Sequence, residues 1–262
     1  MRVSIFASGS SGNCALFSAG GTNILIDAGI SARRVCAFLA GEGLTPQELD
    51  GVLVTHEHSD HVSGLPMLLK RFPLRVLAPG RAAGQLRALV PGYGEYIEEI
   101  APGRGFALGG AYVSPFATLH DAAGSVGYRL DGEGCSFGVC TDLGCVTDEV
   151  LDTLCGVEGA LIEANHDVGM LRRGPYPYHL KRRILSDHGH LCNEDCAQLA
   201  VTLAAAGAET LILGHLSRHN NTPQAAYEAV SAALAESGQG RCELLVAPPL
   251  GPLVLEEKRC SA

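Results

Sequence analysis

A dense group of histidines and acidic residues lies between positions 56 and 61. The segment Val52-Leu-Val-Thr-His56-Glu57-His58-Ser59-Asp60-His61 begins as an apolar strand and ends in four potential metal ligands. On an extended backbone, residues i and i+2 project to the same side, so His56 and His58 can share one ion. Where the chain turns into a helix, Asp60 and His61 can point to a neighbouring ion. Imidazole and carboxylate groups suit zinc, manganese and iron(II), so the segment predicts a metal site rather than a solvated polar loop.

The elements around this group must bring further ligands to it. Predicted strands, rich in β-branched and apolar residues and bounded by turn signals, are Arg2–Ala7, Cys14–Phe17, Asn23–Asp27, Val52–Thr55, Tyr112–Leu119, Val126–Leu130, Ser136–Thr141, Ala160–Glu163 and Leu211–Leu213. Predicted helices are Ser31–Ala40, Gly64–Arg71, Asn193–Ala205 and Pro223–Ala235, with Ser31 and Asn193 as N-caps. Strand pairs followed by strand–helix alternation, repeated once, indicate two packed sheets flanked by helices.

Composition narrows the class of protein. The 262 residues include 47% apolar and 18% charged residues, which predicts one domain over 1–262 with a well-buried core. No apolar run approaches the roughly 18–20 residues of a membrane helix, and no signal-peptide core is visible, so we expect a cytoplasmic protein without a membrane partner. Ten scattered cysteines without a C-x-x-C pair predict reduced, mostly buried thiols. The net charge of −9 argues against whole-surface affinity for nucleic acid but leaves room for a local basic patch.

The first motif also carries a resemblance. Thr55-His-Glu-His-Ser-Asp-His61 resembles the T-H-x-H-x-D-H signature of the metallo-β-lactamase superfamily, whose fold is a four-layer αββα sandwich (α/β class) with two metals at one edge of the sheets. Further segments in order resemble its YycJ/VicX (WalJ)-like branch: Ser8–Asn13, His120–Ala123, Cys140–Gly144, Glu163–Asp167, Gly174–Tyr178, Gly189–Asn193 and Leu213–Ser217. Cys14 and Cys192 stand where Ala or Ser is expected, and Leu119 stands where Ser is usual; none of these is a predicted ligand.

The resemblance implies the remaining metal ligands. His120, Asp142 and His215 each follow a predicted strand, and their alternatives are a surface histidine or an ordinary turn aspartate. The implied ligands of one ion are His56, His58, His120 and Asp142, and those of the other are Asp60, His61, Asp142 and His215. The carboxylate of Asp142 would bridge two divalent ions, with zinc or manganese favoured and iron possible.

Two residues are predicted to act beside the metals. In related tRNase Z-like enzymes, a histidine oriented by a glutamate lies opposite the ions, and His190 with Glu163 resembles that pair. A histidine so held can protonate a departing oxygen; the alternative is a structural hydrogen bond. Asp60 is predicted to hold the attacking water as well as an ion. His166, His179, His188 and His219 receive no role.

The substrate prediction depends on a basic segment. Within Leu171–Arg183, the predicted contacts to phosphates and bases are Arg172, Arg173, Tyr176, Tyr178 and Lys181. A solvated helix face is the alternative. The resemblance implies a nuclease acting on DNA, with 5′-to-3′ exonuclease action. A hydrolase of a small phosphodiester or thioester and a non-catalytic metal-binding regulator remain alternatives. Gly80–Gly105 is a candidate substrate entrance or dimer contact, and the oligomeric state stays open.

Overall fold

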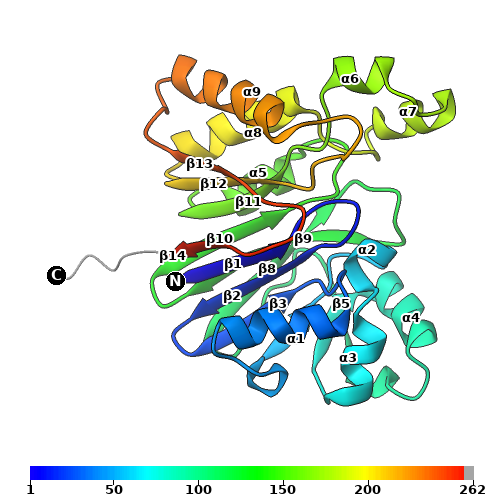
Figure 1. Cartoon of the computed structure of the whole chain (residues 1–262). Helices are drawn as coiled ribbons and strands as arrows, with labels where there is room; N and C mark the ends of the chain where they lie inside the picture. The colour runs from blue at the N-terminus through cyan, green and yellow to red at the C-terminus, as the bar shows by residue number, and fades with distance from the viewer. Residues whose placement is uncertain (257–262) are drawn as a thin grey trace.

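The computed structural model of the protein describes residues 1–256 of the chain. Two seven-stranded sheets pack face to face, and helices cover the outer face of each sheet (Figure 1). The layers therefore run helix, sheet, sheet, helix, which confirms the predicted αββα sandwich. Among residues 1–256, no helix combines the length and apolar composition that crossing a bilayer requires.

The first sheet changes from antiparallel to parallel pairing across its width. In spatial order its strands are β14 (Leu253–Glu256), β1 (Arg2–Ala7), β2 (Cys14–Ala19), β3 (Thr22–Ile26), β4 (Gly51–Leu53), β5 (Val76–Pro79) and β6 (Ile97–Ile100). Strands β1, β2 and β3 pair antiparallel, and β3 to β6 pair parallel. Two antiparallel steps separate β1 from β3, so β1 and the strands from β3 to β6 end at the same edge.

The second sheet repeats this arrangement. In spatial order its strands are β13 (Glu243–Val246), β12 (Thr210–Gly214), β11 (Gly159–Glu163), β10 (Cys135–Cys140), β9 (Ser125–Gly132), β8 (Ala111–Thr118) and β7 (Phe106–Leu108). Strands β8, β9 and β10 pair antiparallel, and β10 to β13 pair parallel. Strand β8 consequently ends at the same edge as β10, β11 and β12.

The helices fall into three groups (Figure 1). Beside the first sheet lie α1 (Ala32–Gly41), α2 (Ser59–Val62), α3 (Leu65–Arg71) and α4 (Gly80–Leu89), with the 3-10 turns η1 (Pro46–Glu48) and η2 (Gly94–Tyr96). The second sheet is covered by α5 (Asp148–Leu154), α8 (Asn193–Ala205) and α9 (Pro223–Glu236). The short helices α6 (Val168–Arg173) and α7 (Tyr178–Ile184) project from one end of the sandwich.

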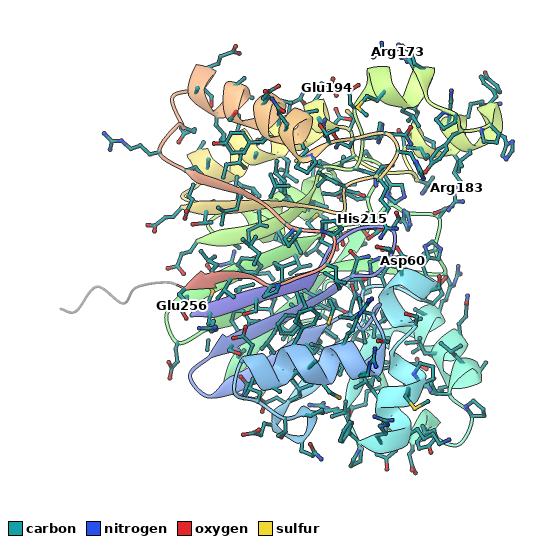
Figure 2. All side chains as sticks on the ribbon, viewed as in Figure 1. Asp60, Arg173, Arg183, Glu194, His215 and Glu256 are labelled. Atoms are coloured by element: carbon teal, nitrogen blue, oxygen red, sulfur yellow. The ribbon has the colours of Figure 1, made fainter. Side chains whose placement is uncertain are left out.

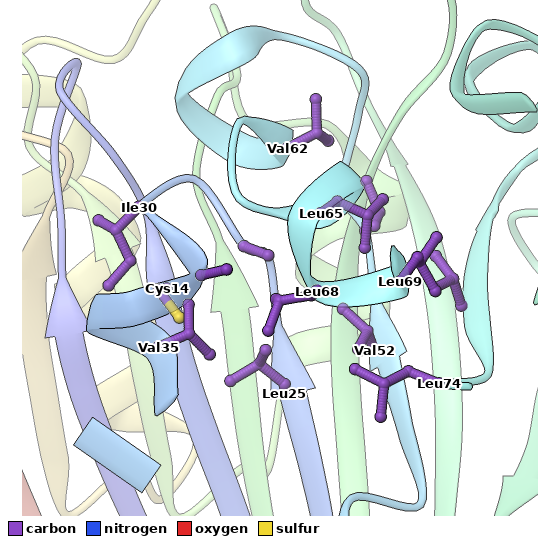
Figure 3. Packing of buried hydrophobic residues seen from close by; sticks show 14 of the residues in the cluster. Cys14, Leu25, Ile30, Val35, Val52, Val62, Leu65, Leu68, Leu69 and Leu74 are labelled. Atoms are coloured by element: carbon purple, nitrogen blue, oxygen red, sulfur yellow. The ribbon is translucent and has the colours of Figure 1, made fainter. Parts of the chain in front are cut away.

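Apolar burial explains the layering. Between the sheets, side chains such as Phe17 and Phe137 form the inner core and are fully buried. Outside the first sheet, Leu25 packs with Val35 of α1 and Leu68 of α3 in a second cluster (Figure 3). A third cluster joins the second sheet to α5, α8 and α9. Strands β10, β11 and β12 are buried along their whole length because layers cover both of their faces.

The start of α8 differs from the prediction. The N-cap is Cys192, whose sulfur accepts a hydrogen bond from the backbone N–H of Asp195 at 3.4 Å, and not Asn193. Asn193 is buried and its amide donates to Asn221 at 3.1 Å. The prediction was wrong because the side chain of Asn193 forms a buried hydrogen bond with Asn221 of another loop and is not available to cap the helix. Ser31 does precede α1, although its side chain makes no capping hydrogen bond.

The cysteines of the described residues are all free thiols, as predicted. Four of them are buried, namely Cys14, Cys135, Cys140 and Cys196, and Cys155 is exposed. Burial is therefore less general than the sequence suggested. Cys260 lies outside the described residues.

Candidate metal centre

The segment from His56 to His61 has the predicted strand-to-helix geometry. Strand β4 is buried, His56 follows it with no exposed surface, and His58 is the extended N-cap of α2. Asp60 and His61 lie in the first turns of α2. The backbone therefore changes from extended to helical between the two pairs, and this change separates their side chains into two groups.

The first group is a triad of imidazoles, His56, His58 and His120, one nitrogen of each lying within 4.8 Å of the others. His120 follows β8, and its Nδ1 lies 3.0 Å from the carbonyl oxygen of Gly189. His56 Nδ1 lies 3.1 Å from the hydroxyl of Thr55. These contacts fix both rings and leave the Nε2 atoms for the centre of the triad.

The second group is the triad of Asp60, His61 and His215, whose ligand atoms also lie within 4.8 Å of one another. His61 Nδ1 lies 2.7 Å from Asp27, and His215 Nδ1 lies 2.8 Å from Glu163. The Nε2 atoms of both rings then face Asp60, at 3.7 and 3.6 Å from its Oδ2. A buried carboxylate contacts Nδ1 of each ring and turns Nε2 toward the triad, the arrangement that orients metal-binding histidines. Nε2 of His61 also lies 2.9 Å from the amide nitrogen of Asn13.

Asp142 lies between the two triads. Its Oδ1 is 3.7 Å from His120 Nε2, and its Oδ2 is 3.2 Å from His61 Nε2. Asp142 follows β10 and is almost completely buried. One carboxylate thus reaches toward both groups, as a bridging ligand must.

Three residues of this centre have a left-handed backbone. The φ angles are 58° at Asp27, 60° at Asp142 and 54° at His215, and Glu133 is the one other non-glycine residue with positive φ in the described chain. Each of the three follows the end of a strand, where the chain turns sharply. Such conformations cost free energy and concentrate where a site requires a particular side-chain direction.

The donor atoms fit a divalent cation. His56 Nε2, Asp142 Oδ2 and His215 Nε2 are buried in the cluster and have no hydrogen-bond partner. A buried polar atom without a partner is costly, and metal coordination removes that cost. Imidazole nitrogen and carboxylate oxygen together suit zinc, manganese or iron. The side chains at this edge of the sheets can therefore hold a divalent metal.

The protein alone concentrates negative charge here. Burial opposes a charged imidazole, yet Asp27 and Asp142 raise the pKa of His61 to about 10. Burial likewise opposes the charge of Asp142, but His215 and His61 hold its pKa well below the ordinary value. The carboxylates thus stabilise positive charge at the centre, and the same negative potential would attract divalent cations.

His190 and Glu163 form a pair beside the triads. Glu163 ends β11, is fully buried, and its Oε1 lies 2.7 Å from Nδ1 of His190. Burial acts against both charges, but each partner favours the other, so the pKa of Glu163 falls to about 2 and that of His190 is raised. The same Oε1 contacts His215, and Oε2 accepts the N–H of Leu143 at 3.0 Å. One carboxylate therefore links His190 to the second triad.

A cleft of about 260 Å³ opens over these groups. Its lining comprises Ser10, His58, Asp60, His120, Asp142, Asn165, Tyr176, Leu180, Arg183, Ile184, Gly189, His190, His215 and Ser217. Helix α7 and the loop before it form one wall, and the edge of the sheets that carries the two triads forms the floor. The segment 80–105 forms α4, η2 and β6 instead and contributes nothing to this lining.

The predicted substrate contacts separate in space. Tyr176 lines the cleft, whereas Arg172, Arg173, Tyr178 and Lys181 do not. The ammonium of Lys181 donates to the carbonyl oxygens of Arg172 and Gly174, at 2.8 and 2.7 Å, and so joins α7 to the end of α6. Figure 2 shows Arg173 on α6, near the top of the view. Arg183, a basic residue of the same segment that is not among the predicted contacts, lines the cleft.

Several residues that support the centre have no predicted role. Asp27 holds His61, the Ser8 hydroxyl accepts the backbone N–H of His215 at 2.8 Å, and the Gly189 carbonyl meets His120. For Asp27 a signal was present, because an acidic residue ended a predicted strand two positions before Gly29. Ser8 lay in a segment that had been noted without a role. A backbone carbonyl leaves no signal in sequence.

The family described as "Beta-lactamase superfamily domain" matches residues 22–216. The chain belongs to the metallo-β-lactamase superfamily. The metallo-β-lactamase fold protein YhfI from Bacillus subtilis superimposes with a TM-score of 0.73 and 16% identity, covering 97% of this chain and 99% of that one. The predicted superfamily and fold are thus confirmed.

Within this superfamily the chain is similar to two named relatives. It is 35% identical over 244 residues to exodeoxyribonuclease WalJ of Streptococcus pneumoniae D39, covering 91% of this chain and 90% of the relative. It is also 35% identical over 243 residues to exodeoxyribonuclease YycJ of Bacillus anthracis, covering 92% and 91%. The predicted YycJ/VicX (WalJ)-like branch is confirmed. This metallo-β-lactamase chain is accordingly a metal-dependent hydrolase by family.

Proposed function

We propose that the protein is a two-metal phosphodiesterase that removes nucleotides from DNA, as a 5′-to-3′ exonuclease. The observation that carries the proposal is that two triads of potential metal ligands lie on either side of Asp142. Buried nitrogen and oxygen atoms of these residues lack hydrogen-bond partners, as expected of metal ligands. The relatives named exodeoxyribonuclease align with nine tenths of the chain and support DNA as the substrate class. The cleft over the triads provides room for a phosphodiester.

In this proposal the first ion is held by His56, His58, His120 and Asp142, and the second by Asp60, His61, Asp142 and His215. Divalent ions bound there would lower the pKa of a water molecule and offset negative charge on the phosphate. Zinc or manganese is the favoured metal and iron is compatible, because the described ligands include no thiolate.

Asp60 is proposed to orient the attacking water. Its carboxylate lines the cleft, and one oxygen approaches both His61 and His215. Burial opposes ionisation, but His215 and His61 lower the pKa of Asp60. The ionised carboxylate accepts a hydrogen bond from water and so directs a lone pair of the water oxygen toward the phosphorus.

His190 is proposed to protonate the leaving oxygen. Its Nδ1 is occupied by Glu163, which leaves Nε2 for the cleft. Although burial opposes a charged ring, Glu163 raises the pKa of His190 and so favours the ring that carries a proton on both nitrogens. A proton on Nε2 is then available to the oxygen that departs from phosphorus, as general acid catalysis requires.

End-labelled DNA tests the proposal. Duplex and single-stranded DNA with a label at either end, RNA, bis(p-nitrophenyl) phosphate and a thioester are incubated with manganese, zinc or magnesium. We expect mononucleotides to be released from 5′ ends and activity to disappear in Asp142→Ala and His58→Ala. Retained turnover after rigorous metal removal, or hydrolysis of the thioester or the small diester alone, contradicts it. Inactivity on every substrate with metal correctly bound would instead support a regulator.

A further inference from the structure

One cationic side chain reaches the cleft from the basic segment. Arg183 is the one lysine or arginine in the cleft lining formed by the described residues. Leu180, Arg183 and Ile184 share a face of α7 because positions i, i+3 and i+4 of a helix lie on one side. Arg182 lies off that face and is exposed. Because of the helical period, Arg183 faces the cleft and the neighbouring Arg182 does not.

The guanidinium of Arg183 is held by an acidic residue beside the first triad. Arg183 Nε pairs with Asp121 Oδ2, and Asp121 Oδ1 lies 3.3 Å from Nε2 of His120. His120 belongs to the first triad, so a single carboxylate separates the guanidinium from that triad. The ion pair between Arg183 and Asp121 connects α7, in the wall of the cleft, to the loop after β8, at its floor.

The pair leaves most of the guanidinium free. Asp121 engages Nε, and the structure gives the two terminal nitrogens of Arg183 no partner within residues 1–256. The side chain is 53% exposed, so these nitrogens are open to solvent and to a ligand. Two parallel N–H groups match two phosphate oxygens, which a lysine ammonium cannot reproduce. An exposed ion pair contributes little to stability, so stabilising the fold is a weak reason for this arrangement.

We propose that Arg183 binds a phosphate of the substrate in the cleft and that Asp121 positions its guanidinium for this contact. The inference rests on the proposed phosphodiesterase function and adds the residue that recognises the anionic backbone. Arg183 supplies a local positive charge in the cleft of a protein whose net charge is −9. Asp121 is a positioning residue, since it acts through Arg183.

The first test measures binding without catalysis. A fluorescein-labelled single-stranded oligonucleotide is titrated with metal-free protein in EDTA, and anisotropy gives the dissociation constant. Arg183→Gln is expected to weaken binding about 10-fold, the loss of one charged hydrogen-bonding contact. Arg182→Gln, which removes the same charge next to it, is expected to change affinity less than about 2-fold. The slope of log affinity against log salt is expected to fall by about 0.7 in Arg183→Gln alone.

The positioning role of Asp121 needs a double-mutant cycle. Asp121→Ala is expected to weaken binding about 3-fold when Arg183 is present and not at all in the Arg183→Gln background. All variants are expected to melt within about 3 °C of the wild type. Equal losses for Arg182→Gln and Arg183→Gln, additive effects of Asp121→Ala and Arg183→Gln, or no binding by wild-type protein overturns the proposal.

Kinetics distinguish this inference from the proposed function. With manganese, Arg183→Gln is expected to raise KM about 10-fold for both DNA and bis(p-nitrophenyl) phosphate, with kcat within about 3-fold of wild type. If wild-type protein hydrolyses only the small diester, the proposed DNA activity fails while the role of Arg183 is still measured on that substrate. An unchanged KM for every hydrolysed diester contradicts the role of Arg183, whatever the natural substrate.

Discussion

Replacing Glu163 by Gln is expected to damage the centre without removing a proposed ligand. Glu163 Oε1 accepts from His190 and His215 at 2.7 and 2.8 Å, and Oε2 accepts from Leu143 at 3.0 Å. A glutamine keeps one acceptor oxygen and presents an NH2 group in place of the other. At least one buried donor then loses its partner, at about 1–3 kcal/mol. Because the carboxylate also orients His215, we expect metal affinity to fall about 10–100-fold.

The same substitution is expected to reduce kcat at least about 100-fold at saturating metal, because His190 loses the anion that orients it. The direction of the pH effect follows from the raised pKa of His190. Activity that needs protonated His190 is present below this pKa and is lost as pH rises through it. Without the Glu163 anion the pKa of His190 falls, so the alkaline loss of activity moves to lower pH.

Steady-state rates between pH 5 and 10, with metal affinity from competition against a chromophoric chelator, measure both effects. Glu209→Gln is the matched control, since Glu209 is exposed and the substitution removes the same charge. The control is expected to change stability by less than about 0.5 kcal/mol and to leave the pH profile unchanged. An alkaline limb at the wild-type position in Glu163→Gln, with kcat preserved, would refute the proposed roles of both Glu163 and His190.

Three further predictions concern the partner of His61, the effect of metal on stability, and the burial of the cysteines. Asp27→Asn is expected to weaken metal binding about 10–100-fold, because His61 loses the carboxylate that orients it, whereas the exposed Asp152→Asn leaves the titration unchanged. Metal at 100 times its dissociation constant is expected to stabilise the fold by about 2.7 kcal/mol, a rise of about 5–10 °C in Tm by calorimetry; an unchanged Tm contradicts binding to the folded state. Burial raises the pKa of the Cys196 thiol well above its ordinary value, so maleimide at pH 8 is expected to label the exposed Cys155 and spare Cys196 in native protein, as peptide mass spectrometry would show.

The sequence predicted the elements that carry the centre more accurately than the elements around it. Every predicted strand corresponds to a strand of the structure. The alternating or continuous apolar pattern of a strand can be recognised without knowing which strand pairs with it. The sequence predicts no element for β5, α4, β6, β7, α5, α6, α7, β13 or β14. Helix α7 buries only Ile184, so its sequence carries almost no apolar period to detect. The basic composition of Leu171–Arg183 therefore marks the segment in the sequence, but its helix and the face turned to the cleft do not show there.

The N-cap of α8 shows how a local rule can fail. Asparagine is among the preferred N-caps, and Asn193 was therefore the natural choice. The structure gives the cap to Cys192 and uses Asn193 for a buried pair with Asn221, 28 positions further along. A capping preference of about 1 kcal/mol is no greater than the cost of leaving a buried amide without a partner. A contact between two loops distant in sequence therefore determines which residue is the N-cap of α8.

By itself, the sequence determined the superfamily, the sandwich fold and the list of side chains that meet at one edge of the sheets. Spacing along a strand and a helix turn predicts the group His56–His61, whereas the superfamily, its fold and the ligands His120, Asp142 and His215 are implied by the resemblance of its motifs. Only the tertiary structure decided which carboxylates orient His61 and His215, and which arginine faces the cleft. Asp27 reaches His61 across 34 positions and Glu163 reaches His215 across 52, and such contacts follow from the order of strands in a sheet. Strand order is fixed by the packing of the whole chain, and no local pattern of residues encodes it.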